Sequence, residues 1–178
     1  GFDWINNGQD FIWISEKDGW RHIYKISRDG KTETLLTKGN YDIDVVKCID
    51  QVNNYIYFTA SPNSATQKYL YRIKIENKKM PVGAVKVKMN NNDPQLLSAA
   101  DLKGTHDYSI SPGGKFATHT FSNYKTPELR EWITLPDNKP INPAKSIATL
   151  VKTDTDVDIE YLQVITDDNV TLDAWINK

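Results

Sequence analysis

Short runs in which hydrophobic and polar residues alternate recur along this chain, separated by polar turns. Three such runs lie between residues 10 and 37, and each is rich in aromatic and β-branched residues. Turns that carry Gly19 and Gly30, each preceded by an aspartate, separate the runs. Because Asp-Gly readily adopts the positive φ of a tight hairpin turn, the pattern predicts an antiparallel meander with strands at 11–15, 22–27 and 32–37.

The same arrangement repeats twice more, and the second strands of the three units begin near residues 11, 55 and 116. Units of ~40–50 residues with four strands each are typical of β-propeller blades. No stretch of the sequence sustains a helical periodicity. We therefore predict an all-β fold: about three four-stranded antiparallel blades of a partial β-propeller, followed by a C-terminal β-hairpin. The blades are expected at approximately 1–37, 41–98 and 104–151.

Two segments interrupt the blade pattern. The lysine- and asparagine-rich segment 77–93 is expected to be either a β-ribbon around 84–89 or a mobile loop. The segment 136–143 is expected to be a loop, because its prolines cannot donate ladder hydrogen bonds. The outer strands of the second and third blades are predicted at 94–98, 128–134 and 146–151.

After residue 151 the pattern changes. Two hydrophobic runs flank an Asp-Asp-Asn turn at 167–169 and predict a hairpin that falls outside the blade spacing. We therefore divide the chain into a partial β-propeller at 1–152 and a second part at 153–178, which consists of a linker and the first hairpin of another domain. The chain opens on Gly1 rather than methionine, so we expect that it was processed or excised from a longer protein.

Composition and charge exclude several classes of function. Lys and Arg number 22 against 23 Asp and Glu, so the chain lacks the basic field that nucleic acid requires. Its longest apolar runs are too short for a transmembrane helix. Cys48 is the only cysteine, which excludes an internal disulfide and a cysteine-based metal cluster. We predict no cofactor and no metal.

Candidate catalytic residues do not form a recognisable constellation. The Gly-x-Ser-x-Gly elbow of serine hydrolases is absent from the sequence. His22, His106 and His119 each lie inside a strand pattern, where a lone histidine is usually structural. The alternating acids at 154–158 resemble a calcium-binding loop. However, isoleucine occupies the positions at which that loop needs glycine and a bidentate glutamate, so we interpret the run as a solvated linker. We predict no catalytic, substrate-binding or metal residue in this chain.

Other short motifs have a structural interpretation as well. Ser111-Pro112-Gly113-Gly114-Lys115 lacks the first glycine and the Ser/Thr of a phosphate-binding loop and is predicted to be a hairpin turn. Asn169-Val170-Thr171 fits the glycosylation pattern but lies in a tight turn. The aromatic residues could form a platform for sugar or peptide, but packing between blades explains them better. The residues assigned to inter-blade packing are Trp13, Trp20, Tyr24, Tyr57, Tyr69 and Tyr71.

Several segments resemble one protein family in a single collinear order. The residues FIWISEKDGWRHIY at 11–24 and LTKGNYD at 36–42 are similar to a strand signature and a blade junction in the N-terminal propeller of dipeptidyl-peptidase IV-like enzymes, of the prolyl oligopeptidase family. The segments 57–62, 69–73 and 104–112 continue the resemblance. The last segment, 164–175, resembles the hairpin with which the family's α/β-hydrolase domain begins.

The resemblance implies an eight-bladed propeller that caps a hydrolase domain with a Ser-Asp-His triad and cleaves N-terminal dipeptides after proline or alanine. A glutamate pair and an arginine of the family's propeller hold the substrate. By its collinear order, the resemblance implies that the glutamate pair lies before Gly1 and the triad after Lys178. This chain itself contains no Glu-Glu pair. The fragment is expected to be inactive and to self-associate. Its parent is expected to be a periplasmic or secreted homo-oligomer. In that parent, the propeller is expected to contact peptide substrates and the protein's own hydrolase domain.

Two alternatives stay open from the residues alone. A non-enzymatic propeller module for binding or scaffolding would close its ring with further blades and would carry no hydrolase sequence. A sugar-active propeller enzyme would need paired carboxylates at a central cleft, and no pair in this sequence points to one.

Overall fold

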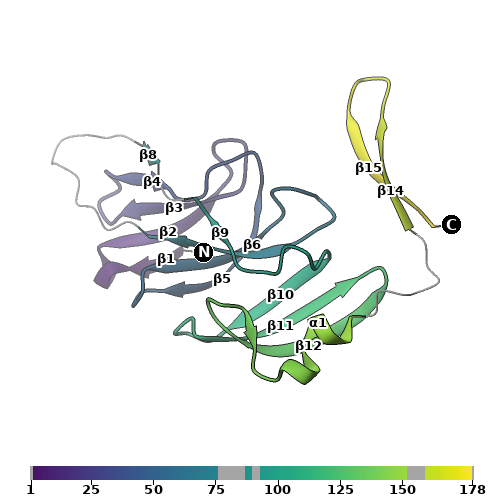
Figure 1. The fold of residues 1–178 in the computed structure, drawn as a ribbon. Helices are drawn as coiled ribbons and strands as arrows, with labels where there is room; N and C mark the ends of the chain where they lie inside the picture. The colour runs from purple at the N-terminus through teal and green to yellow at the C-terminus, as the bar shows by residue number, and fades with distance from the viewer. Residues whose placement is uncertain (1, 76–86, 90–92, 152–158, 178) are drawn as a thin grey trace.

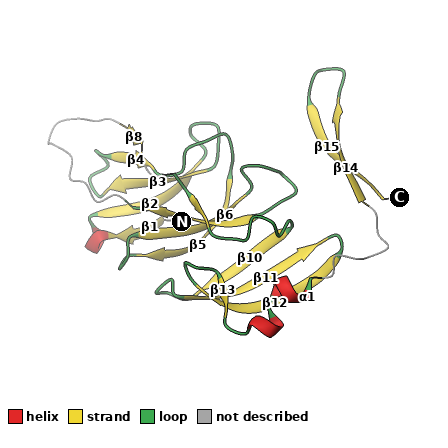
Figure 2. Cartoon of the chain, viewed as in Figure 1, coloured by secondary structure: helices red, strands yellow, loops and turns green. Residues whose placement is uncertain are grey.

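The computed structural model describes residues 2–75, 87–89, 93–151 and 159–177. Its described residues form antiparallel sheets that lie side by side, with a separate hairpin beyond them (Figure 1). Short helical segments are the exception among strands (Figure 2). The predicted all-β fold with propeller-like blades is therefore confirmed. No helix among the described residues is long and apolar enough to cross a membrane.

The first blade is the meander predicted at the N-terminus. Its strands are β1 (Phe2–Ile5), β2 (Asp10–Ser15), β3 (His22–Ser27) and β4 (Glu33–Leu35), with the short 3-10 helix η1 (Asn6–Gly8) between β1 and β2. The strands pair in sequence order. Gly19 has φ 95° and Gly30 has φ 72°, so both turns use the left-handed backbone that glycine tolerates without strain.

The second blade repeats this order. It consists of β5 (Ile43–Asp50), β6 (Tyr55–Ala60), β7 (Tyr69–Lys74) and β9 (Gln95–Leu96). The strand predicted at 94–98 is thus reduced to two residues. From the predicted ribbon, β8 (Val87–Met89) forms a strand, but it pairs in parallel with β4 of the first blade. The rest of that ribbon, 84–86, lies outside the described residues.

The third blade corrects the sequence prediction at its outer edge. Its strands are β10 (Thr105–Ile110), β11 (Phe116–Asn123), β12 (Thr126–Thr134) and β13 (Lys139–Pro140). The predicted outer strand at 146–151 is wrong, because this segment forms α1 (Ile147–Leu150) after the 3-10 helix η2 (Pro143–Lys145). Ser146 caps α1, and its hydroxyl accepts a hydrogen bond from the Thr149 N–H.

The outermost strand of the third blade instead lies inside the predicted loop 136–143. Pro140 pairs with Ile133 on the edge strand of the sheet. Proline lacks a backbone N–H, and an edge strand tolerates this because one of its sides has no neighbouring strand to bond. The N–H of Ile141 then donates to the carbonyl of Trp132 over 2.8 Å. Proline therefore shortens this strand but does not abolish it.

Apolar side chains fill the spaces between neighbouring blades. One cluster joins the first and second blades, and a second cluster joins the second and third. The predicted inter-blade packing is confirmed for Tyr57, Tyr69 and Tyr71, which belong to these clusters. Trp13 and Trp20 lie outside both clusters, with exposed fractions of 43% and 39%, so for these two residues inter-blade packing stays a prediction.

Trp13 is exposed because strand residues alternate between two faces. Ile12 points into the cluster toward the second blade, so Trp13 lies on the opposite face of the first blade. Tyr24 pairs with Trp13 across the strands and shares that face. It is buried, but in a small separate cluster with Ile26 and Leu35 rather than between blades.

The C-terminal hairpin is present as predicted. It consists of β14 (Ile159–Ile165) and β15 (Thr171–Asn177), paired from Ile159↔Asn177 to Ile165↔Thr171. Asn169 has φ 63° in the turn. The acidic run 154–158 and the domain boundary near 153 lie outside the described residues, so the assignment of the hairpin to a second domain stays a prediction.

Candidate functional site

The third blade carries a cluster of titratable side chains on the face that it turns toward the second blade. Because strand residues alternate, His106 and Tyr108 of β10 share this face with His119 of β11 and Glu131 of β12. The register places Tyr108 opposite His119 and His119 opposite Glu131. The sheet itself thus brings two imidazoles, a phenol and a carboxyl group together, and we call these four residues the histidine cluster.

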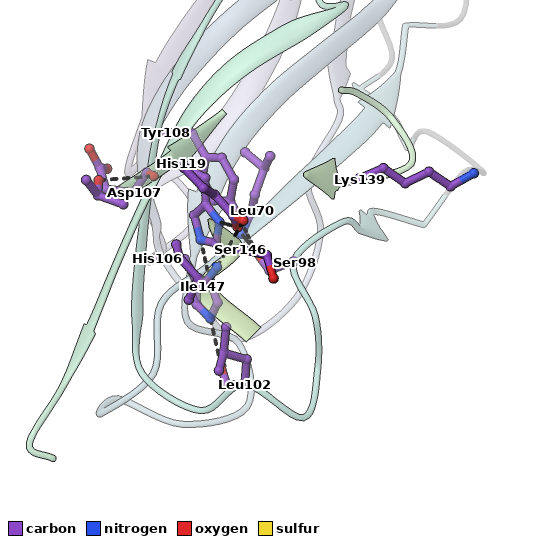
Figure 3. A network of polar contacts seen from close by, with 12 residues as sticks. Leu70, Ser98, Leu102, His106, Asp107, Tyr108, His119, Lys139, Ser146 and Ile147 are labelled. Atoms are coloured by element: carbon purple, nitrogen blue, oxygen red, sulfur yellow. Dashed lines mark hydrogen bonds and ion pairs between the residues drawn. The ribbon is translucent and has the colours of Figure 1, made fainter. Parts of the chain in front are cut away.

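Hydrogen bonds link the histidine cluster into a chain whose two ends are backbone groups. His106 Nε2 lies 2.7 Å from the carbonyl oxygen of Leu102, and His106 Nδ1 lies 2.9 Å from His119 Nε2 (Figure 3). His119 Nδ1 lies 2.8 Å from Glu131 Oε1. The second carboxyl oxygen of Glu131 accepts a hydrogen bond of 3.1 Å from the N–H of Ile147 in α1.

Aromatic contacts orient these rings. The rings of His106 and His119 lie edge to edge, 5° from parallel with centroids 5.1 Å apart, and the ring of Tyr69 of the second blade lies 5.1 Å from that of His106 at an interplanar angle of 31°. The hydroxyl of Tyr108 lies 2.9 Å from Ser98 Oγ, which also accepts a hydrogen bond from the N–H of Leu70. The cluster therefore connects the third blade to the second.

Burial determines the protonation of the cluster. His106 and His119 are only 0% and 2% exposed, and desolvation lowers the pKa of each imidazole to about 4. Desolvation also raises the pKa of the Glu131 carboxyl group. Both effects disfavour the charged forms of these side chains.

A groove of about 840 Å³ adjoins the histidine cluster at the end of the third blade. Leu102, whose carbonyl oxygen binds His106, is part of its lining. Lys103 and Lys125 contribute charged side chains to the lining, and Tyr161, which belongs to the hairpin, contributes an aromatic ring. The ring of Tyr161 meets that of Tyr124 edge to face at 5.9 Å. The groove is therefore bordered by both the third blade and the hairpin.

His22 stands apart from the cluster. Its ring is 1% exposed, with Nε2 3.1 Å from the carbonyl oxygen of Gly39 and Nδ1 3.2 Å from Thr37 Oγ1. Both ring nitrogens thus have partners within the first blade and its junction with the second. This environment is that of a structural histidine, as the sequence suggested.

Sequence reasoning treated His106 and His119 as isolated residues and missed their contact. The signal was present in the turn at 112–115, which sets Ser111 and Phe116 at the base of the hairpin. Counting back from that turn places position 108 opposite 119, so 106 falls on the same face two residues further. To find Glu131, the register would also have to be followed through the turn between β11 and β12, which places position 131 opposite 119.

Of the remaining sequence motifs, the structure tests the glycine-containing segment 111–115. Gly114 has φ 62° in the turn between β10 and β11, and its N–H donates to the carbonyl of Ser111, so this motif is a hairpin turn as predicted. The three-acid run at 154–158 lies outside the described residues. Among the residues that are described, no group of three or more His, Cys, Asp or Glu side chains could hold a metal ion.

Comparisons with known proteins agree with the blade architecture. Residues 2–128 match the family model for the dipeptidyl peptidase IV (DPP IV) N-terminal region. Dipeptidyl peptidase 4 of Trichophyton rubrum is 32% identical over 76 residues, which are 43% of this chain and 10% of that protein. "Probable dipeptidyl-aminopeptidase B" of Talaromyces marneffei is 28% identical over 171 residues, which are 91% of this chain and 17% of that protein.

The crystal structure of Porphyromonas gingivalis dipeptidyl peptidase 4 superposes with a TM-score of 0.71 at 21% identity, over 99% of this chain and 23% of that one. The chain thus spans no more than 17% of the length of the two curated relatives named above. The family model covers well over half of the chain, and it ends inside the third blade. The chain therefore belongs to the dipeptidyl peptidase IV N-terminal region family.

Proposed function

We propose that this chain is the C-terminal part of the propeller of a dipeptidyl-peptidase IV-like serine exopeptidase, together with the first hairpin of its hydrolase domain. The carrying observation is the alignment with the Talaromyces marneffei relative, which runs through 91% of the chain. An alignment of that length extends beyond the residues of the family model and toward the hairpin. In the parent protein, the blades would limit access to the active site and dock the N-terminal ends of peptides.

Within this proposal the chain itself is not catalytic. A hydrolytic triad needs a nucleophile hydrogen-bonded to a base that substrate can reach. Thr37 Oγ1 lies 3.2 Å from His22 Nδ1, but Thr37 is fully buried and its hydroxyl accepts a hydrogen bond from the N–H of Ile23. In the histidine cluster, the serine hydroxyl of Ser98 contacts a tyrosine rather than an imidazole.

The test begins with the reading frame on both sides of this segment in its source gene. We expect further blades upstream, and ~200–260 residues downstream that contain a Gly-x-Ser-x-Gly elbow. The protein encoded by the whole frame should release N-terminal Xaa-Pro or Xaa-Ala dipeptides from chromogenic substrates. Replacement of the elbow serine by alanine should abolish that activity, and the 178-residue chain alone should show none.

A different flanking sequence would overturn this proposal. If further blades or a stop codon followed Lys178 without a hydrolase sequence, the chain would be part of a non-enzymatic propeller for binding or scaffolding. We also propose that the parent is a periplasmic or secreted homo-oligomer. Fractionation of the source cells and sedimentation of the whole protein test those two points separately from its activity.

A further inference from the structure

The hydrogen-bond chain through the histidine cluster can be followed atom by atom, and its ends fix the positions of its protons. The carbonyl oxygen of Leu102 can only accept, so His106 Nε2 must carry the hydrogen of that 2.7 Å contact. In a neutral imidazole the other nitrogen then has a lone pair. His106 Nδ1 therefore accepts, and His119 Nε2, at 2.9 Å, donates.

The same assignment of hydrogens shows that the contact between His119 and Glu131 lacks a proton. Once His119 Nε2 carries a hydrogen, Nδ1 of a neutral His119 presents a lone pair to Glu131 Oε1 at 2.8 Å. At the far end of the carboxyl group, Oε2 accepts from the N–H of Ile147. An ionised Glu131 would thus place two lone pairs face to face, so this link requires one additional proton.

Reversing both rings does not remove this requirement. If His119 Nδ1 donated to an ionised Glu131, His119 Nε2 would have to accept from His106 Nδ1. His106 Nε2 would then present a lone pair to the carbonyl oxygen of Leu102. With two neutral imidazoles and an ionised carboxylate, one link is always broken, and adding one proton repairs the whole chain.

We propose that the histidine cluster is a buried proton-binding site, which holds one proton between His119 and Glu131 at neutral pH and loses it under alkaline conditions, when one link of the chain opens. The hydrogen-bond chain joins Leu102, which lines the groove, to Ile147 of α1, the last described element before the hairpin. Loss of the proton therefore loosens the end of the third blade, from which the polypeptide continues toward the hairpin. This inference does not depend on the proposed exopeptidase activity.

The surroundings of the cluster favour the neutral, protonated form. Tyr69 of β7 and Tyr108 of β10 face the imidazoles with aromatic rings, and burial raises the pKa of both phenols. Asp107 acts on His119 electrostatically, but it is paired with Lys47 at 2.7 Å. The segment before β10 and α1 contribute backbone groups to the chain. Burial raises the pKa of the Glu131 carboxyl group, which places the proton on the acid.

The variant Glu131→Gln mimics the proposed form, because its amide N–H can donate to His119 Nδ1 while its oxygen accepts from Ile147. The matched control is Glu128→Gln on the same strand, whose side chain is 67% exposed and lies 3.5 Å from Arg130 Nη2. Urea unfolding midpoints of the wild-type chain and both variants would be measured from pH 5 to pH 10. In parallel, NMR of the wild-type chain with ¹³C-labelled glutamate would follow the Glu131 carboxyl carbon, assigned through its own backbone.

The proposal expects the Glu131 carboxyl group to stay protonated at pH 7, where an ordinary carboxyl group is ionised. The urea midpoints of E131Q and wild type should coincide at the low end of the range. They should diverge in favour of E131Q as the pH rises from about 4.5, where the carboxyl group of the unfolded chain ionises, to the Glu131 inflection of the folded chain. Above that inflection the difference should stay constant, while E128Q follows wild type throughout. A Glu131 carboxyl group that is already ionised at pH 7 would overturn the proposal, as would parallel profiles for wild type and E131Q. If E131Q did not fold, the wild-type NMR titration alone would decide.

Discussion

Tyr108 and His119 lie ring on ring across β10 and β11, with centroids 4.5 Å apart and planes 3° from parallel. The phenol hydroxyl at the far end of this stack reaches Ser98 Oγ, which follows the outer strand of the second blade. One pair of rings therefore orients the histidine cluster and fastens it to the neighbouring blade. Tyr108 thus stabilises the fold in two ways, by ring packing on His119 and by the hydrogen bond to Ser98. Substitutions of Tyr108 can measure the two contributions separately.

Tyr108→Phe should destabilise the chain by about 0.5–1.5 kcal/mol, because it removes one buried hydrogen bond and keeps the stack. Ser98 Oγ would retain its hydrogen bond from the N–H of Leu70. Tyr108→Ala should cost about 3–5 kcal/mol, because it also leaves a cavity between the blades. Urea unfolding measures both losses. Tyr124→Phe, at a tyrosine that is 42% exposed, is the control and should change stability little.

The chain should lose stability on acidification between pH 6.5 and pH 4. The folded-state pKa values of His106 and His119 are about 4, below the ordinary value of 6.5. The unfolded chain therefore binds protons more readily than the folded chain. The stabilisation that comes from the two depressed histidine pKa values is complete above pH 6.5 and is lost as the pH falls through 4. Its size is on the order of a few kcal/mol. Urea midpoints at a series of pH values measure it.

His119→Gln removes one of the two imidazoles and should make this acid loss shallower. Lys115→Gln, which removes an exposed charge from the same blade, should leave its slope unchanged. Equal slopes for wild type and H119Q would show that the acid loss arises elsewhere in the chain.

The blade pattern could be predicted from sequence because its determinants are local. Gly19 and Gly30 each follow an aspartate and adopt the positive φ that the hairpin turns require. Alternation of residue types then defines the strands on either side. The family motifs lie in the same local segments, and the match over 2–128 confirms the resemblance that they indicated.

The features that were missed depend on contacts distant in sequence. The strand Lys139–Pro140 is too short for a pattern and exists because Ile133 and Trp132 provide its partners. The segment 146–151 is rich in β-branched residues, yet the Ser146 cap and the hydrogen bond from Ile147 to Glu131 favour a helical turn. The histidine cluster likewise depends on the register of two hairpins.

Gly104→Ala should destabilise the third blade by about 1–3 kcal/mol through overpacking. A Cβ atom at Gly104 would lie 2.5 Å from the carbonyl oxygen of Ser122 and 2.6 Å from the ring of Phe121. Gly113→Ala is the matched control, because nothing lies within 4 Å of a Cβ atom there. Thermal unfolding of both variants should separate them clearly. An equal effect at the two glycines would mean that backbone entropy, not steric contact, determines the result.

The 178-residue chain should self-associate through the face of the first blade that points away from the second. Phe2, Trp4 and Trp13 are 57%, 45% and 43% exposed on this face, and Phe2 packs edge to face on Trp4 at 5.7 Å. A contiguous exposed apolar surface of this kind promotes association. Sedimentation velocity over a range of concentrations should therefore show a mass above that of the monomer.

Trp4→Glu should reduce this association, because it places a charge in the patch beside the guanidinium of Arg28, which lies over the Trp4 ring at 5.6 Å. Trp132→Thr removes an indole that is 61% exposed on the third blade and should leave the association unchanged. Circular dichroism would establish that both variants keep their strands. A monodisperse wild-type monomer, or a loss of association only in W132T, would contradict the assignment of the interface to the first blade.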